Sequence, residues 1–235
     1  MSMRNPKIAV IDSGIGGLSV LKGLVEAYPY CEFLYFGDND SAPYGSRSKS
    51  DLISLTIKNL SFVLSFDVDL LVVACNTLCV SILDEIRGFS PVPVIPIFPP
   101  VEREMISGDR VLLLATDVTA NRYKGVKNVS AFGLTALVKE IEGVAPFFEK
   151  VDIKRFLKKI DGRFDTIILG CTHFLFVKNQ IFNHFCPKKI ISGNELVVSS
   201  VYILGKSIVK HLRFRVKFIG KSAKKNAYVW SKITP

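Results

Sequence analysis

The chain has 235 residues, of which 49% are hydrophobic and 22% are charged, and these values are ordinary for a soluble globular protein. They exclude a disordered chain, a collagen-like repeat and a small fold held by disulfides. The first hydrophobic run, from Ile8 to Ile11, is cut short by Asp12 and is too short for a signal peptide or a membrane span. We therefore expect a cytoplasmic protein that does not engage a membrane.

Cysteine spacing and charge distribution narrow the class further. The five cysteines show no Cys-x-x-Cys spacing, so a disulfide framework is not expected in a protein that is not secreted. Much of the net charge of +10 comes from the C-terminal segment, which holds nine Lys or Arg residues after Glu195 and no Asp or Glu. Such a segment can attract nucleic acid, and a solvated basic face is the simpler interpretation.

Short β-branched runs alternate with longer stretches of helical periodicity, which predicts an α/β fold with a largely parallel sheet. The expected strands are Lys7–Ile11, Glu32–Phe36, Asp69–Ala74, Val92–Phe98, Arg110–Ala115, Val129–Phe132, Asp165–Gly170 and Lys188–Ile191. The expected helices are Leu18–Tyr28, Lys49–Ser65, Leu78–Gly88, Thr135–Gly143, Lys154–Lys159, Leu175–His184 and Glu195–Leu212. From Phe214 to Phe218 hydrophobic and basic residues alternate, which predicts one more strand with a basic exposed face.

Two segments of the chain echo each other. V-D-L-L-V-V-A-C-N-T (68–77) and F-D-T-I-I-L-G-C-T-H (164–173) share an acidic residue, a hydrophobic core, a small residue, a cysteine and two polar residues. A weaker echo pairs residues 8–13 with residues 111–116. The offsets of 96 and 103 residues are too long for a solenoid repeat. They predict two related α/β units, with the proline-rich segment 91–100 as the crossover.

Cys75 and Cys171 each follow a predicted strand and precede a predicted helix. Ligands of open α/β sheets bind beyond the carboxyl ends of the strands, so two units that face each other would bring both thiols to one cleft. A helix N-terminus lowers the pKa of a thiol, and inversion of a stereocentre requires acid–base groups on opposite faces of one carbon. A cysteine hydrolase would instead need one thiol with a base and an oxyanion hole. Two merely buried cysteines are the remaining alternative.

The residues beside the two thiols are polar. Asn76, Thr77, Thr172 and His173 supply hydrogen-bond donors for a carboxylate, and Asp12 could hold an ammonium group or orient a thiol. The segment D-S-G-I-G-G-L that begins at Asp12 matches neither a dinucleotide-binding fingerprint nor a phosphate loop. The alternatives are a helix cap for Asp12 and a core position for His173. No further ligand at metal-binding spacing lies near His173 and its neighbouring cysteine, so we expect no metal.

Five motifs follow one another along the chain. They are D-S-G-I-G-G-L-S-V (12–20), Y-F-G-D-N-D-S-A-P-Y-G (35–45), A-C-N-T (74–77), A-T-D-V-T (115–119) and L-G-C-T-H (169–173). In this order and separation the chain resembles bacterial glutamate racemase, of the aspartate/glutamate racemase superfamily, over most of its length. The resemblance implies two pseudo-symmetric α/β domains with mainly parallel sheets, an active site in the cleft between them and no cofactor. Residues 1–95 plus 206–235 would form the first domain and residues 96–205 the second.

The same resemblance implies that Cys75 takes the α-proton from D-glutamate and Cys171 from L-glutamate, with Asp12 and His173 as auxiliary acid–base groups. The residues that would hold the substrate are Asp12, Ser13, Tyr44, Gly45, Asn76, Thr77, Thr172 and His173. Tyr44 and Gly45, which follow Pro43, could also form a simple turn. We expect a homodimer that binds glutamate and supplies D-glutamate for peptidoglycan. The alternatives are another substrate, such as aspartate or a hydantoin, and a nucleic-acid-binding role of the basic segment.

The chain departs from the family pattern at several positions. Pro99-Pro100 replace a usual Glu-Pro, Asn121 stands near a usual serine, Phe174-Leu175 replace Tyr-Pro, and Ser192-Gly193 replace Asp-Ser. The segment before Val151 is shortened, and Glu149 is the nearest candidate for the glutamate that the family has there. None of these departures involves the two thiols.

Overall fold

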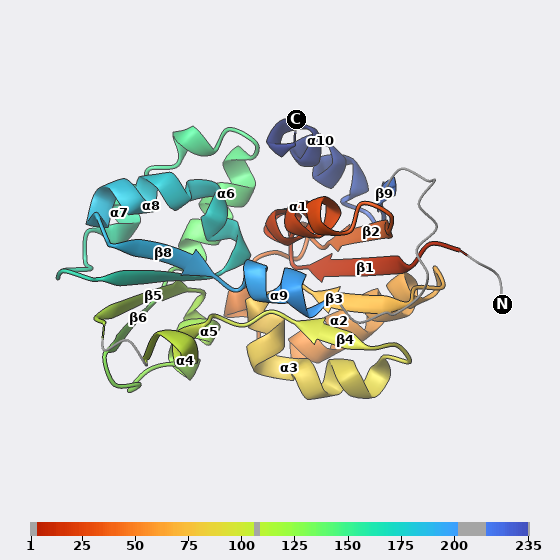
Figure 1. The fold of residues 1–235 in the computed structure, drawn as a ribbon, viewed down its shortest axis with the longest axis horizontal. Coiled ribbons are helices and arrows are strands. Elements are labelled where there is room, and N and C mark those ends of the chain that lie inside the picture. Colours follow the sequence, from red (N-terminus) through yellow and green to blue (C-terminus); the bar gives the residue numbers. More distant parts are fainter. Residues whose placement is uncertain (1–3, 106–108, 202–214, 235) are drawn as a thin grey trace.

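The computed structural model describes residues 4–105, 109–201 and 215–234. It contains two β-sheets, one in each half of an elongated molecule (Figure 1). The first sheet has the strand order β4-β3-β1-β2-β9 and the second the order β6-β5-β7-β8. All the strand pairs in both sheets are parallel. The expected fold class, α/β with two mainly parallel sheets, is confirmed.

The strands and helices have the following bounds. The strands are β1 (Lys7–Asp12), β2 (Glu32–Gly37), β3 (Leu70–Val73), β4 (Val94–Pro96), β5 (Val111–Ala115), β6 (Val129–Gly133), β7 (Thr166–Gly170), β8 (Lys189–Ser192) and β9 (Arg215–Phe218). The α-helices are α1 (Leu18–Ala27), α2 (Lys49–Leu64), α3 (Asn76–Phe89), α4 (Val101–Met105), α5 (Asp117–Arg122), α6 (Thr135–Val144), α7 (Ile153–Leu157), α8 (Lys178–Phe185), α9 (Asn194–Ser200) and α10 (Ala223–Ile233). Short 3-10 helices are η1 (Tyr44–Ser46), η2 (Phe148–Lys150) and η3 (Thr172–Val177).

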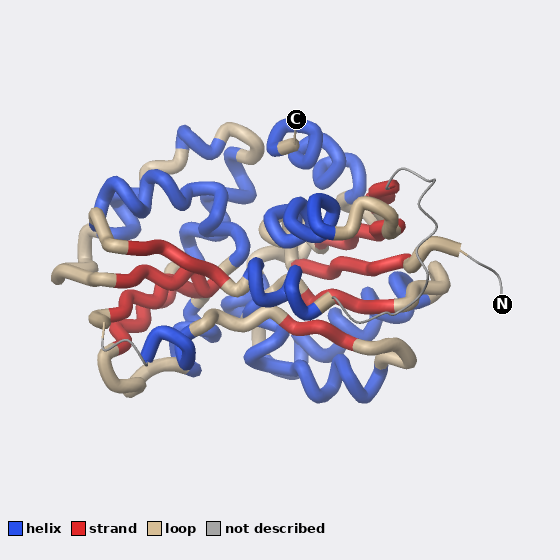
Figure 2. Tube along the Cα trace, in the orientation of Figure 1, coloured by secondary structure: helices blue, strands red, loops and turns tan. Residues whose placement is uncertain are grey.

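The central strands are buried because helices lie on both faces of the sheets (Figure 2). β3, β5 and β7 are buried along their whole length. They are almost entirely Val, Leu and Ile, as expected for parallel strands that are covered on both sides. Burying one such side chain contributes about 1.5–3 kcal/mol. These strands therefore form a rigid base, and the loops at their carboxyl ends are held in defined positions.

The chain crosses twice between the two halves. It leaves the first sheet after β4, builds the second sheet, and returns after β8 through α9, which packs against α1. The Tyr28 hydroxyl donates to the Val198 carbonyl (2.7 Å), and Asn194 Nδ2 donates to Ser19 Oγ (3.1 Å). β9 then joins the edge of the first sheet beside β2, and α10 lies next to that half (Figure 1). The C-terminal end of the chain thus contributes to the first half.

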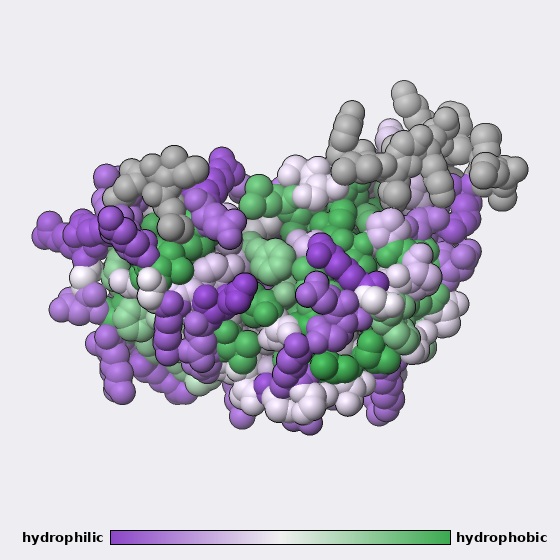
Figure 3. All heavy atoms as spheres, turned by 90° about the horizontal axis from the view of Figure 1, so that it is seen from below, coloured by the Kyte–Doolittle hydropathy of each residue, from purple (hydrophilic) through white to green (hydrophobic). Residues whose placement is uncertain are grey.

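Hydrophobic residues reach part of the molecular surface. Seen from below, they gather mainly in the middle of the molecule, and hydrophilic residues predominate toward its ends (Figure 3). Phe98 and Leu196, exposed by 39% and 41%, line a groove between α4 and α9. Within the three described ranges, no helix combines the length and apolar character needed to cross a bilayer.

Most of the expected strands and helices are present. The eight strands expected between Lys7 and Ile191 are found, with the fourth shortened to β4, and the expected strand near Phe218 is β9. The helix expected to start at Leu175 is wrong in its first turn, because that stretch is the 3-10 helix η3. Of the helix expected over 195–212, α9 ends at Ser200, and residues 202–212 lie outside the described part of the chain.

Three helices, α4, α5 and α10, were not expected from the sequence, and the longest of them is α10. Its only buried residues are Asn226 and Val229, and its sequence A-K-K-N-A-Y-V-W-S-K-I has few large hydrophobic residues that would mark it as a core helix. The domain boundaries, 1–95 plus 206–235 and 96–205, remain a proposal.

Candidate active site

The carboxyl ends of the central strands of both sheets meet at one small pocket. β1 ends at Asp12, β3 leads into Cys75 and β7 leads into Cys171. Both cysteines line the pocket, one from each half of the molecule, and the empty volume is about 260 Å³. The lining residues are Ser13, Pro43, Tyr44, Gly45, Cys75, Asn76, Thr77, Thr116, Val138, Cys171, Thr172 and His173. The structure thus brings the expected site residues together, and Asp12 joins them through a contact with Thr172.

Cys75 lies at the N-cap of α3 and is buried. Its thiol donates to Ser13 Oγ (3.7 Å). Burial, and after it the negative charge of Asp12, raises the pKa of Cys75 to about 12. Hydrogen bonds with the Leu78 backbone and with Ser13 lower that pKa, but by less. The expectation that the helix N-terminus lowers the pKa of this thiol is therefore wrong for the structure as it stands, because burial outweighs the helix.

Cys171, in contrast, has a charged neighbour. Its Sγ lies 3.7 Å from His173 Nδ1, and His173 Nε2 lies 2.8 Å from Glu142 Oε1. Burial lowers the pKa of His173, but the interactions with Cys171 and Glu142 outweigh it and raise that pKa well above 6.5. His173 is 1% exposed, and both ring nitrogens face ionisable groups. It is thus a cation at neutral pH and not a core histidine bonded only to backbone.

Glu142 was not singled out in the sequence, yet its carboxylate is one of the most strongly bonded groups of the site. Oε1 accepts from the Ile15 amide (2.7 Å), and Oε2 accepts from Asn39 Nδ2 (2.9 Å) and Lys225 Nζ (2.8 Å). Although burial raises the pKa of Glu142, the interactions with His173 and Lys225 lower it to about 2. Glu142 is therefore ionised over the whole physiological pH range.

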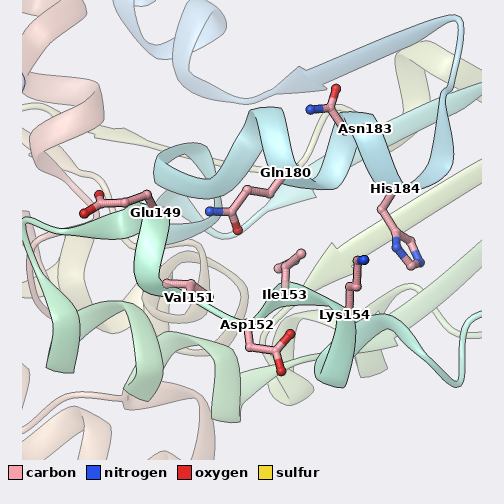
Figure 4. A pocket seen from close by; sticks show the side chains of 8 residues that line it. All are labelled: Glu149, Val151, Asp152, Ile153, Lys154, Gln180, Asn183 and His184. Carbon is pink, nitrogen blue, oxygen red and sulfur yellow. The ribbon is translucent and has the colours of Figure 1, made fainter.

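Glu149, the nearest candidate from the sequence, lies elsewhere. Its side chain is exposed and stands at one end of a separate groove between η2, α7 and α8 (Figure 4). That groove shares no lining residue with the pocket of the two cysteines. The carboxylate that faces His173 belongs to Glu142, on α6, and Glu149 is not part of this site.

Asp12 connects the two halves. Its Oδ1 accepts from the Gly14 amide (2.8 Å), and its Oδ2 accepts from Thr172 Oγ1 across the interface (3.3 Å). The N-cap of α1 is Gly17, so capping that helix is not what places Asp12 here. Burial raises the pKa of Asp12 to about 6, and the neighbouring His173 opposes that rise. Asp12 is therefore a carboxyl group that titrates close to neutral pH.

The glycines of the D-S-G-I-G-G-L segment allow the two halves to approach each other closely. A Cβ at Gly16 would overlap His173 Nδ1 and Thr172 Oγ1, and a Cβ at Gly14 would overlap the Glu142 carboxylate. Any side chain at these positions would push the loop after β1 away from the second half.

Tyr44 is more than part of a turn. It is 3% exposed and lines the pocket. Its hydroxyl donates to Asp38 Oδ2 (2.8 Å), which also accepts from Asn59 Nδ2 (3.1 Å). Burial raises the pKa of Tyr44 far above its usual value, and Asp38 adds to the effect. The hydroxyl is therefore held neutral as a donor, and the loop that carries Tyr44 is fixed against α2.

Polar side chains at the start of α3 complete the pocket. Thr77 Oγ1 and Thr116 Oγ1 lie 2.9 Å apart and join the two halves. Asn76 is 5% exposed, and its Oδ1 has no hydrogen-bond partner among the residues that the structure describes. An amide that is buried and lines a pocket in this way is available to a ligand.

Four residues at the pocket or behind it were missed: Pro43, Thr116, Val138 and Glu142. Thr116 could have been found, because the weak echo between residues 8–13 and 111–116 pairs it with Ser13. Val138 and Glu142 lie on α6, whose sequence carries no feature that sets these two apart.

The departures from the family pattern lie away from the pocket lining. Phe174 is fully buried in the core, and Asn121 is exposed. Pro99 lies against the position of Gly170, and Gly193 is the N-cap of α9. None of these is among the described residues that line the pocket.

Some of the basic C-terminal residues that the structure describes make contacts within the chain. Lys225 binds Glu142, and the Lys217 ammonium lies 5.0 Å from the centre of the Phe66 ring. Three further basic residues of the segment, at positions 206, 210 and 213, lie outside the described ranges. In the described part of the chain, no group of three or more His, Cys, Asp or Glu residues is arranged to hold a metal ion.

Comparisons with known proteins agree on one family. The sequence model of the family described as Asp/Glu/Hydantoin racemase matches residues 32–201. The glutamate racemase of Clostridium acetobutylicum is 34% identical over 210 residues, which cover 83% of this chain and 82% of that protein. The glutamate racemase of Aquifex aeolicus is 33% identical over the same shares of the two chains. The crystal structure of glutamate racemase from Campylobacter jejuni superposes with a TM-score of 0.77 at 26% identity, over 97% of this chain and 99% of that one. The chain therefore belongs to the Asp/Glu/Hydantoin racemase family.

Proposed function

We propose that this chain is a glutamate racemase that interconverts L- and D-glutamate with two thiol bases and no cofactor. The observation that carries the proposal is one enclosed pocket with Cys75 from one half and Cys171 from the other, each beside its own acid–base partner. Relatives that match more than four-fifths of the chain are named glutamate racemases. A two-sided pocket is the arrangement that stereoinversion needs.

In the proposed reaction, one thiolate removes the α-proton and the other thiol protonates the opposite face of the same carbon. Cys75 takes the proton from D-glutamate and Cys171 takes it from L-glutamate. The removed proton stays on the attacking sulfur, so each turnover exchanges the protonation states of the two cysteines. Asp12 assists Cys75, and His173 assists Cys171.

The ionisation of Cys75 follows from what the substrate brings. A pKa of about 12 leaves the thiol protonated at neutral pH and ready to act as an acid. If the substrate's ammonium group bound near Asp12, it would offset the negative charge of the Asp12 carboxylate and favour the thiolate form of Cys75. The substrate itself would thus activate this base.

Polar groups of the pocket would hold the two carboxylates and the ammonium group. Ser13, Asn76 and Thr77 lie around the N-terminus of α3, where free backbone amides favour an anion. Tyr44, Gly45, Thr172 and His173 would hold the substrate from the opposite walls. Asn76 supports this role because its amide is buried and its oxygen lacks a described partner.

A Cys–His hydrolase is the competing interpretation of the pair Cys171 and His173. It leaves unexplained why a second cysteine lines the same pocket at the equivalent strand end. A racemase uses both thiols, and we therefore favour it.

The deciding experiment is α-proton exchange. Purified protein is incubated with L-glutamate or D-glutamate in deuterated buffer, and ¹H NMR follows the α-proton while polarimetry follows optical rotation. We expect deuterium incorporation from both enantiomers and complete loss of rotation. Absence of exchange with either enantiomer would overturn the proposal. Parallel incubations with aspartate test the alternative substrate, and faster exchange of aspartate would replace glutamate by aspartate in the proposal.

The wider setting is part of the same proposal. D-Glutamate made by the enzyme would be used for peptidoglycan, and the enzyme would work in the cytoplasm, where thiols stay reduced. All five cysteines are free in the structure, which suits that compartment. A homodimer remains a prediction, and light scattering at several protein concentrations measures it directly. Salt-dependent binding to nucleic acid would favour the alternative role of the basic segment.

A further inference from the structure

The C-terminal helix α10 reaches the acid–base machinery of the second half through one side chain. Lys225 Nζ donates to Glu142 Oε2 (2.8 Å) and to the Glu142 main-chain carbonyl (3.1 Å). Its side chain is 40% exposed, whereas that of Glu142 is 10% exposed. The ammonium group therefore binds both the carboxylate and the backbone of Glu142 from the solvent side.

Glu142 connects Lys225 to the buried residues of the site. One oxygen, Oε2, binds Lys225 and Asn39, and the other, Oε1, binds Ile15 and His173. The four donors come from different segments of the chain, so the carboxylate has one orientation. His173 in turn lies 3.7 Å from the Cys171 sulfur. A continuous chain of contacts thus runs from α10 to Cys171.

We propose that Lys225 is a positioning residue for the half-reaction of Cys171: it fixes the Glu142 carboxylate, which orients and charges His173 beside that thiol. The inference rests on the proposed racemase function and extends it to a residue of the C-terminal helix. Lys225 does not line the substrate pocket, so its effect on substrate binding is indirect and small.

The charged groups around Glu142 explain why Lys225 matters. The ionisable groups that face Glu142 are His173 from η3, Lys225 from α10, Asp12 from the end of β1 and the neutral Tyr35 from β2. Two cations therefore balance two carboxyl groups. Without the ammonium group of Lys225, the pKa of Glu142 rises, because one of the interactions that lower it is gone. The carboxylate then loses one anchor and takes up a proton at a higher pH.

The half-reactions can be measured separately with glutamate that carries chloride on its β-carbon. A single base removes the α-proton, the electron pair forms a double bond to the β-carbon, and chloride leaves. The enamine product then hydrolyses to a keto acid and ammonia. A C75S variant retains only Cys171 and should process the L-configured analogue, and a C171S variant should process the D-configured one. Net racemisation cannot give this separation, because its two directions are linked by an equilibrium constant of one.

The test introduces Lys225→Met into each of these backgrounds. In C75S, elimination from the L-configured analogue should fall about tenfold, as expected for loss of a hydrogen bond to a charged group. The acidic limb of the pH–rate profile for this elimination should move to higher pH. In C171S, the rate with the D-configured analogue should stay within about twofold. Lys225→Arg should restore most of the lost rate, because it keeps the positive charge.

The neighbouring Lys224, which is exposed, supplies the matched control: Lys224→Met removes the same charge from the same helix and should leave both rates unchanged. Equal losses in both backgrounds, or an unchanged rate and pH profile with Lys225→Met, would overturn the positioning role. Thermal melting of each variant identifies a loss of fold, and Lys225→Gln then replaces Lys225→Met in the same comparison. Elimination in neither single-cysteine background would overturn the racemase proposal itself.

Discussion

The surroundings of Cys75 and Cys171 show how two halves of similar architecture acquire different chemistry. Each thiol follows a buried central strand and faces the same pocket. Around Cys75 the neighbours are Ser13 and a carboxyl group, and the pKa of the thiol is raised to about 12. Around Cys171 stands a cation, His173, backed by Glu142. Pseudo-symmetry of the fold therefore places the two bases, and the residues behind them give each thiol a different electrostatic environment.

The largest expected effect comes from removing either thiol. Cys75→Ser and Cys171→Ser should each lower the racemisation rate about 1,000-fold or more, since a general acid or base contributes up to about 10,000-fold. Circular dichroism or a coupled assay for D-glutamate measures the rate. Cys186→Ser is the control, because that cysteine is exposed and should not matter. Substantial racemisation by either active-site variant would contradict the two-thiol scheme.

Each auxiliary group should affect mainly the half-reaction of its own thiol, and the loss of rate should be smaller than for removal of the thiol. Asp12→Asn should slow the Cys75 half-reaction about 100-fold, and His173→Gln should slow the Cys171 half-reaction by a similar factor. Each is measured as elimination from the matching enantiomer of β-chloroglutamate. If both variants slowed the two half-reactions equally, the assignment of one partner to each thiol would be wrong.

Glu142 and Glu149 form a matched pair for the next prediction. Glu142→Gln should lower racemisation roughly tenfold and lower the pKa of His173, because the carboxylate is one of the groups that raise it. NMR titration of the imidazole resonances follows this change, since the chain has only three histidines. Glu149→Gln should change neither quantity. If only Glu149→Gln lowered the racemisation rate, the carboxylate that supports catalysis would be Glu149 and not Glu142.

The smallest effect concerns stability. Burial raises the pKa of Asp12 to about 6 from 3.8, so the folded state holds this proton more tightly than the unfolded state. The stabilisation is complete below pH 3.8 and is lost as the pH rises through about 6. Asp12→Asn should therefore raise the melting temperature by a few degrees at pH 8, an effect of about 2 kcal/mol. At pH 4 the difference should vanish. A melting temperature at pH 8 that is lower than that of the wild type would show that the ionised carboxylate stabilises the fold.

Local patterns in the sequence predict a large part of this site. The duplicated strand–cysteine segments place Cys75 and Cys171 at strand ends, and this placement follows from β periodicity and topology alone. The resemblance to glutamate racemase adds Ser13 and Tyr44, both of which line the pocket. Strand positions are predicted well, because parallel strands buried on both faces leave continuous hydrophobic runs.

What could not be predicted depends on contacts between distant segments. Glu142 and Lys225 are 83 residues apart in the chain, and no periodicity links a lysine on an amphipathic helix to one particular carboxylate. The raised pKa of Cys75 is of the same kind, because burial depends on how the two halves close over the thiol. A helix N-terminus can be recognised in the sequence, whereas the burial that outweighs it is a property of the tertiary structure.

The most direct test of the central claim, that each half supplies the base for one enantiomer, is elimination of chloride from the two enantiomers of β-chloroglutamate by single-cysteine variants. We predict that Cys75→Ser retains elimination from the L-configured analogue only, and that Cys171→Ser retains it from the D-configured analogue only. The same enantiomer preference in both variants, or elimination from both enantiomers by one variant, would contradict the account.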